Sequence, residues 1–165
     1  MKTAVVTGAI AVLVLVGAPS AFAQTTATGA INVTAAVNAK AKLTLGSASV
    51  AFADADPDVS PSIAASAVTV AVKARTSAAG TVALTVLASG DLTSGSDSIG
   101  VGNLTWTASG SGFQAGTSNK TTAQTVGSWT GSGSPAGAQT YALANSWAYA
   151  TGTYTVTLNY TLTAP

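Results

Sequence analysis

The stretch Gly152-Thr-Tyr-Thr-Val-Thr-Leu-Asn-Tyr-Thr-Leu-Thr-Ala-Pro165 decides the fold of this chain. Threonine or asparagine occupies every second position from residue 153 to residue 163. The positions between them hold large apolar residues, which are Tyr154, Val156, Leu158, Tyr160 and Leu162. Side chains alternate between the two faces of a strand, so the pattern predicts a strand with one buried face. Burying each large side chain contributes about 1.5–3 kcal/mol, and we expect the domain to depend on this strand.

A second alternating run extends from Ile31 to Leu45, with Ile31, Val33 and Val37 among its apolar residues. The run exceeds the usual strand length of about five or six residues. It predicts either one strand that crosses between two sheets or two segments with separate partners. Lys40 and Lys42 lie on its polar face, as is typical of an edge strand.

Shorter alternating segments fill much of the remaining chain. The predicted strands are Ser49–Ala53 with Val50 and Phe52 inward, Ala67–Arg75 paired with Thr81–Leu87 as a hairpin, Ile99–Ala108, Gln139–Leu143, and one or two more within Ser109–Gly137. No segment has a helical period. Seven to nine short strands predict an all-β, immunoglobulin-like antiparallel sandwich that forms a single domain over residues 24–165.

The first 23 residues have the pattern of an export signal. Lys2 precedes the apolar run Ala9–Val16, and Ala21-Phe-Ala23 matches a small-x-small cleavage site. The alternative is a retained membrane anchor, but the run is shorter than the ~20 residues needed to span a bilayer. We therefore expect cleavage before Gln24, no membrane span afterwards, and a location in the periplasm or at the cell surface.

The composition of the chain limits the classes of function that it can have. Without Lys2, five cations balance five aspartates, which predicts neither nucleic-acid nor anionic-membrane binding and makes self-association easy. The chain has no cysteine and no histidine, so it lacks the thiol nucleophile and the commonest general base. We expect a non-enzymatic protein with no cofactor.

Two groups of residues are candidate ligand sites. Asp54, Asp56 and Asp58 alternate in a proline-containing loop and could hold calcium, although a solvated acidic turn is the stronger interpretation. Trp147 and Tyr149 precede the last strand and are the candidate surface aromatics for stacking on a sugar, although aromatic residues in small sandwiches more often pack in the core.

Both ends of the chain resemble a known family. The run Thr28-Gly-Ala-Ile-Asn-Val-Thr-Ala-Ala-Val-Asn-Ala-Lys-Ala-Lys-Leu43 and the following Ser49-Val-Ala-Phe-Ala53 are similar to the start of spore coat protein U-like subunits of archaic chaperone–usher pili. Gly152, fourteenth from the C-terminus, and the alternating strand after it fit the end of such subunits. The chain lacks the disulfide that is usual there.

This resemblance implies an incomplete sandwich that a neighbour's N-terminal extension completes by strand addition. Residues 24–37 would then be a donor strand, or otherwise an edge strand. The implied partners are other copies or related surface subunits, and a periplasmic chaperone.

The C-terminus also resembles the WxL domain of cell-wall-associated proteins. Tyr154-Thr-Val-Thr-Leu-Asn-Tyr-Thr-Leu162 follows the form Tyr-x-x-Thr-Leu-x-Trp-x-Leu, with Tyr160 in place of tryptophan. The leading expectation is therefore a structural subunit of a bacterial surface fibre or coat. The alternative is a monomeric surface-binding module, either associated with the cell wall or carbohydrate-binding.

Overall fold

The computed structural model describes residues 25–165, so the predicted signal peptide, residues 1–23, lies outside the described residues. Residues 36–165 form one compact unit. The described residues before it, 25–35, have no regular secondary structure, and their side chains are exposed. From residue 25 onward, no helix is long and apolar enough to cross a membrane.

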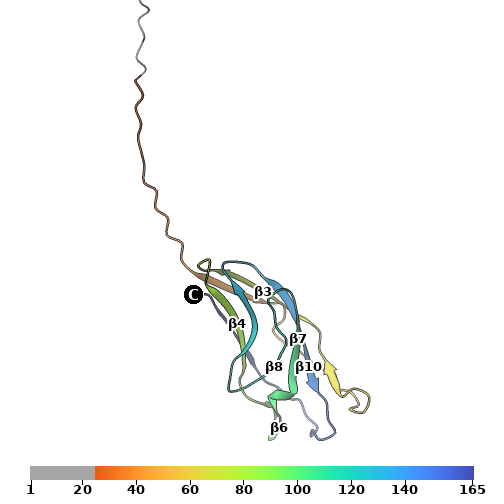
Figure 1. Ribbon diagram of the computed structural model, residues 1–165. Coiled ribbons are helices and arrows are strands. Elements are labelled where there is room, and N and C mark those ends of the chain that lie inside the picture. Colours follow the sequence, from red (N-terminus) through yellow and green to blue (C-terminus); the bar gives the residue numbers. More distant parts are fainter. Residues whose placement is uncertain (1–24) are drawn as a thin grey trace, which may run out of the picture. The chain divides into compact units, whose positions relative to one another are not determined.

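The compact unit is an antiparallel β-sandwich, as the alternating segments predict (Figure 1). The first sheet has the order β1 (Lys40–Leu45), β3 (Val68–Arg75), β10 (Ala136–Ala144), β7 (Leu104–Ser109) and β8 (Gly116–Thr117), with β2 (Ser62–Ala64) also paired to β10. The second sheet has the order β11 (Leu158–Thr163), β4 (Thr81–Ala88) and β9 (Gln124–Thr130). A small hairpin joins β5 (Leu92–Ser94) to β6 (Asp97–Ile99).

The two sheets enclose one main core. Its residues come from alternate positions of the strands, as the period-2 pattern requires. The buried residues of this core are Val68, Val70, Val72, Val82, Leu84, Val86, Leu104, Trp106, Val126 and Tyr141. A smaller cluster of Ala88, Leu92, Ile99 and Val101 continues it beyond the end of β4, where a 3₁₀ turn (Val101–Asn103) precedes β7.

The predicted hairpin between residues 67–75 and 81–87 is wrong. Both segments are strands, β3 and β4, but each belongs to a different sheet. Val70 of β3 and Leu84 of β4 are both fully buried in the core between the sheets. The turn closed by Gly80 N–H donating to Ser77 O (3.0 Å) therefore carries the chain across the sandwich instead of back along one sheet.

The two long terminal runs form less strand than their patterns predict. Only Lys40–Leu45 of the first run pairs, because β3 ends at Arg75, which lies opposite Lys40. Only Leu158–Thr163 of the last run is β11, because β4 ends at Ala88, which lies opposite Leu158. The residues that precede β11 are attached to the rest of the sandwich by an isolated bridge between Thr93 and Thr155.

The predicted strand Ser49–Ala53 is also wrong, since these residues have no strand structure. Pairing with β3 ends where Gly46 N–H donates to Thr69 O (2.8 Å). Phe52 still packs against the core, as predicted, whereas Val50 is 36% exposed.

Candidate functional site

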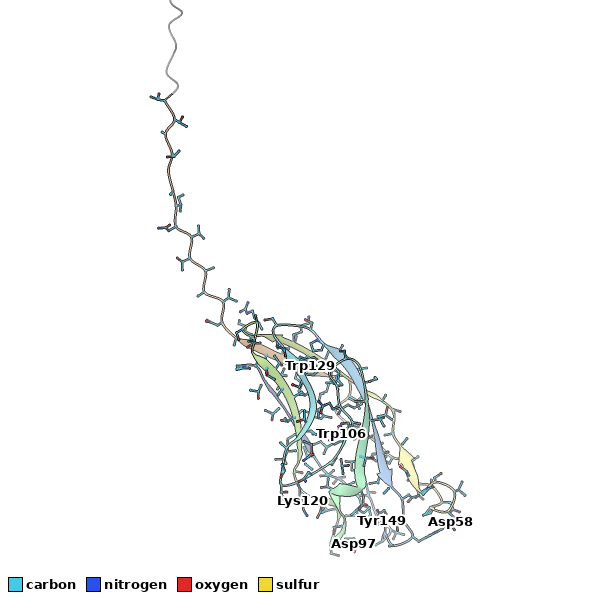
Figure 2. The ribbon with its side chains drawn as sticks, viewed as in Figure 1. Asp58, Asp97, Trp106, Lys120, Trp129 and Tyr149 are labelled. Atoms are coloured by element: carbon cyan, nitrogen blue, oxygen red, sulfur yellow. The ribbon has the colours of Figure 1, made fainter. Side chains whose placement is uncertain are left out.

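The two lateral sides of the sandwich are built differently. On the closed side, between β8 and β9, residues 112–118 hydrogen-bond to both sheets: Gln114 N–H donates to Val126 O (2.8 Å), and Ser118 N–H donates to Leu104 O (2.8 Å). The indole N–H of Trp106 donates to Gln114 O (2.9 Å). Phe113 and Trp129 also pack edge to face, with ring centroids 4.9 Å apart. Figure 2 labels Trp106 and Trp129. This side is sealed by backbone and aromatic contacts.

The open side lies between β1 and β11, the edge strands of the two sheets. A groove of about 390 Å³ lies on this side and begins at Leu45, the last residue of β1. Residues 45–52 line one wall and residues 154–160 line the other, and the lining also includes core residues Val68, Leu92, Leu104 and Tyr141. Among residues 25–165, no strand joins β1 to β11 or pairs with the groove-facing edge of β11.

The groove leaves the core incompletely covered. Alternate residues of β4, in the middle of its sheet, are fully buried, whereas the inward residues of β11 are only half-buried. Val156, Leu158, Tyr160 and Leu162 pack against the core and yet remain partly exposed. The predicted inward face of the last strand is therefore correct, but its burial is not complete.

Polar groups lie beside the groove. The hydroxyl groups of Tyr141 and Tyr160, both of which line it, contact each other, and the Tyr160 hydroxyl donates to Gln139 Oε1 (2.5 Å). Burial raises the pKa of both tyrosines above the ordinary value of 10.0, and the neighbouring Tyr141 adds to the rise in the pKa of Tyr160. Gln139 is fully buried, and its Nε2 has no hydrogen-bond partner among residues 25–165.

The N-terminal run carries unpaired apolar side chains. Ile31 is 89% exposed, Val33 88% and Val37 69%, and residues 25–39 have no strand structure. These three residues belong to the segment 24–37 that the family resemblance implies as a donor strand. The described residues thus include both a groove with unpaired edges and an extended segment with unburied alternating side chains.

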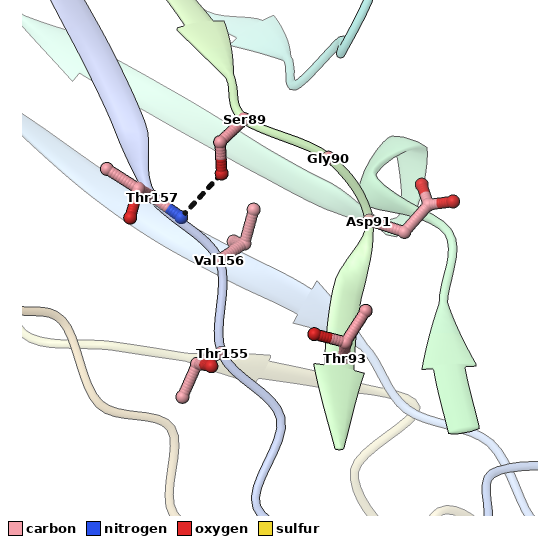
Figure 3. A pocket seen from close by; sticks show the side chains of 7 residues that line it. All are labelled: Ser89, Gly90, Asp91, Thr93, Thr155, Val156 and Thr157. Carbon is pink, nitrogen blue, oxygen red and sulfur yellow. Dashed lines mark hydrogen bonds between the residues drawn. The ribbon is translucent and has the colours of Figure 1, made fainter. Parts of the chain in front are cut away.

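A second, polar recess lies beside the groove and is lined by Ser89–Asp91, Thr93 and Thr155–Thr157 (Figure 3). Ser89 Oγ accepts a hydrogen bond from Thr157 N–H (3.3 Å), which tethers the last strand. Figure 3 shows the Asp91 carboxylate directed away from Thr155. That carboxylate pairs with Lys120 (2.5 Å) and accepts a hydrogen bond from Val101 N–H (3.0 Å), and both contacts lower the pKa of Asp91.

Two aspartates of the loop make hydrogen bonds within the chain. Asp56 Oδ1 accepts a hydrogen bond from Asp58 N–H (2.9 Å), and Asp58 Oδ1 accepts one from the indole N–H of Trp147 (3.1 Å). The part of the chain from Thr25 onward contains no group of three or more acidic or other metal-ligating side chains arranged around a common point. The calcium interpretation of Asp54, Asp56 and Asp58 therefore gains no support.

The candidate surface aromatics differ from each other. Trp147 is 70% exposed, whereas Tyr149 is half-buried against the smaller core cluster. Gly152 lies against Ser94, where a side chain would collide.

Sequence reasoning missed part of one wall of the groove. Ser47 and Ala48 line it without any strand pattern, between Leu45 of β1 and the predicted strand Ser49–Ala53, so no periodic signal points to them. Neither the family models nor the curated protein sequences that were compared with the chain give a match. The functional argument therefore depends on the geometry of the groove and of the N-terminal run.

Proposed function

We propose that this chain is a structural subunit of a bacterial surface fibre or coat, in which the N-terminal run of one copy fills the groove of another. The observation that carries the proposal is the open side, where core residues such as Leu158 are only half-buried. Covering such apolar surface is favourable by about 25 cal/mol per Å². A strand laid in the groove would complete the core.

The N-terminal run matches the groove in length and pattern. Ile31–Val37 comprises seven residues, as does the wall Tyr154–Tyr160, and an extended segment of that length spans about 23 Å. Ile31, Val33 and Val37 share one face of an extended chain. They would enter the groove while Asn32 and Thr34 face solvent.

The backbone supports the same arrangement. An unpaired strand edge presents N–H and C=O groups to any extended segment, and strand addition uses these groups for affinity while alternate side chains supply specificity. Each copy would offer one run and one groove, so addition would repeat along a fibre. A periplasmic chaperone would cover the groove before assembly, after export directed by residues 1–23.

Mixing two complementary variants tests this proposal. Val33→Asp places a carboxylate on the inserted face and should disable the run while leaving the groove intact. Val156→Asp should disable the groove and leave the run intact. Each variant alone should remain monomeric by size exclusion with light scattering, and an equimolar mixture should form a dimer and nothing larger.

Asn32→Asp is the matched control, because residue 32 faces away from the groove when Val33 faces into it. It should assemble like the unmodified chain. Fibres formed by Val33→Asp alone, or equal inhibition by Asn32→Asp, would contradict the proposal.

One observation favours a second candidate function. Trp147 is exposed, and its ring is oriented by the hydrogen bond to Asp58, as a platform for sugar stacking would need. A monomeric carbohydrate-binding module would not need the groove. Such a protein should remain monomeric at every concentration, and its Trp147 fluorescence should change on addition of oligosaccharide.

A further inference from the structure

One end of the compact unit is strongly basic. The antiparallel register of β1 and β3 places Lys40 opposite Arg75 and Lys42 opposite Lys73, on one outer face of the sheet. All four side chains are exposed. Like charges directly opposite each other in a sheet are destabilising, so nothing within the strand pair favours this arrangement. Arg75 Nε donates a hydrogen bond to Asn38 O (2.8 Å), and none of the four cations has an ion-pair partner among residues 25–165.

The opposite end is acidic. The chain leaves β10 at Ala144, and Asn145 then donates to Ala55 O (2.9 Å) and Ser60 O (3.1 Å), which fixes the aspartate loop at that end. Asp97, in β6, lies toward the same end as Asp58 (Figure 2). Because β10 begins beside β3 and is nine residues long, the acidic end is about 30 Å from its start.

These charges are not neutralised within the domain. The described residues carry five cations and five aspartates, since Lys2 is the sixth cation of the chain. In this part of the chain the one ion pair joins Lys120 to Asp91. Four cations at one end and four carboxylates at the other, on Asp54, Asp56, Asp58 and Asp97, therefore lack an ion-pair partner among residues 25–165.

We propose that the basic β1–β3 face of one copy docks on the acidic end of a second copy, so that copies associate head to tail. In a head-to-tail contact the basic face of one copy meets the acidic end of the next, which leaves one basic face and one acidic end free, so the contact continues into a filament. This inference deepens the proposed strand addition and rests on it.

The chain connection makes the two contacts compatible in only one orientation. The N-terminal run leads directly into Lys40, and one groove wall, Tyr154–Tyr160, starts after the loop that contains Trp147. If the run lies antiparallel to β11, Val37 reaches the Tyr154 end of the groove. Lys40 is then about 10 Å farther along an extended chain, toward the acidic end of the neighbour. A parallel run would place Lys40 at the wrong end.

Reversing the charges tests the contact. The basic-end variant carries Lys40→Glu, Lys42→Glu and Lys73→Glu, and the acidic-end variant carries Asp54→Lys, Asp58→Lys and Asp97→Lys. The matched control replaces the same three lysines with arginine. The full chain is expressed, and the association rate of the exported protein is followed by light scattering at low and high NaCl concentration.

The unmodified chain and the arginine control should associate about tenfold more slowly at about 500 mM than at about 20 mM NaCl, because salt screens steering between exposed charges. Each single-end reversal should slow association at low salt by about tenfold or more. A chain with both ends reversed should recover the unmodified rate and its salt dependence.

The outcomes separate this inference from the proposed function. Association that resists salt and all charge reversals, but is lost in Val33→Asp, would overturn the charged contact and leave strand addition intact. Association lost on charge reversal but retained in Val33→Asp would support the charged contact and refute strand addition. If the chain with both ends reversed does not regain the unmodified association rate, the inference is overturned. The basic face would then bind a polyanion other than the acidic end of a second copy.

Discussion

The closed and open sides of this sandwich have the same kind of core and differ in what covers it. On the closed side, Trp106 is 2% exposed, and residues 112–118 bridge the two sheets with backbone hydrogen bonds. On the open side, Leu45 is 37% exposed and a groove separates residues 45–52 from residues 154–160. Apolar residues occupy every second position in both β4 and β11. The comparison teaches that a periodic pattern specifies which face is inward but not whether a neighbouring segment covers it.

Truncating core side chains on the two sides should give the largest difference in the free energy of unfolding. Trp106→Ala removes a fully buried ring and the hydrogen bond to Gln114, and it should lower the free energy of unfolding by about 3–5 kcal/mol. Leu158→Ala on the open side should cost only about 1–2 kcal/mol, because part of that side chain already contacts water. Urea unfolding of monomeric protein measures both changes.

Leu84→Ala is the matched control for Leu158→Ala, because Leu84 is the same residue type in the central strand of the same sheet and is fully buried. It should cost about 2–5 kcal/mol. Equal costs for the two leucines would mean that the groove is closed in solution and that the two sides do not differ.

High pH should produce a smaller effect. The pKa values of Tyr141 and Tyr160 are raised in the folded protein, so both stay neutral above pH 10, where unfolded tyrosines ionise. The unfolded state then binds fewer protons, and the free energy of unfolding falls as pH rises. Below about pH 9, titration of this pair should not change the free energy of unfolding. Above pH 10, that free energy should fall by up to about 1.4 kcal/mol per pH unit for each tyrosine.

Urea unfolding between pH 8 and pH 11 measures this slope, and the variant Tyr141→Phe/Tyr160→Phe is the control. Its stability should change much less with pH, because the variant lacks both hydroxyl groups whose pKa is raised in the folded protein. An identical decline in this variant would show that the tyrosine pair beside the groove is open to water.

Much of the sandwich follows from local pattern. Val68, Val70 and Val72 alternate so strictly that β3 and its buried face are predictable, and Leu104 with Trp106 identifies the inward face of β7. Pairing is less accessible, because β3 and β4 follow each other closely and yet cross between sheets. A short connection predicts adjacency in the chain but does not say which sheet receives each strand.

The groove was predictable only in part. The inward residues of the last strand and the exposed apolar run at Ile31 follow from alternation. The opposite wall is mostly irregular chain in which the alternation of Val50 and Phe52 predicted a strand that does not form. The Tyr141–Tyr160 contact joins residues of different sheets and leaves no periodic signal. The charge separation is visible only after register places Lys40 opposite Arg75.

Site-directed disulfide formation tests the central claim most directly, because the chain has no cysteine of its own. A Val33→Cys chain is mixed with a Leu158→Cys chain under mild oxidation, because residue 33 lies opposite residue 158 when Val37 meets Tyr154. A Thr117→Cys chain, exposed on the closed side, replaces the second as control. The account predicts a disulfide between residues 33 and 158 of different copies and none with residue 117. Equal cross-linking to both positions, or none to residue 158, would contradict it.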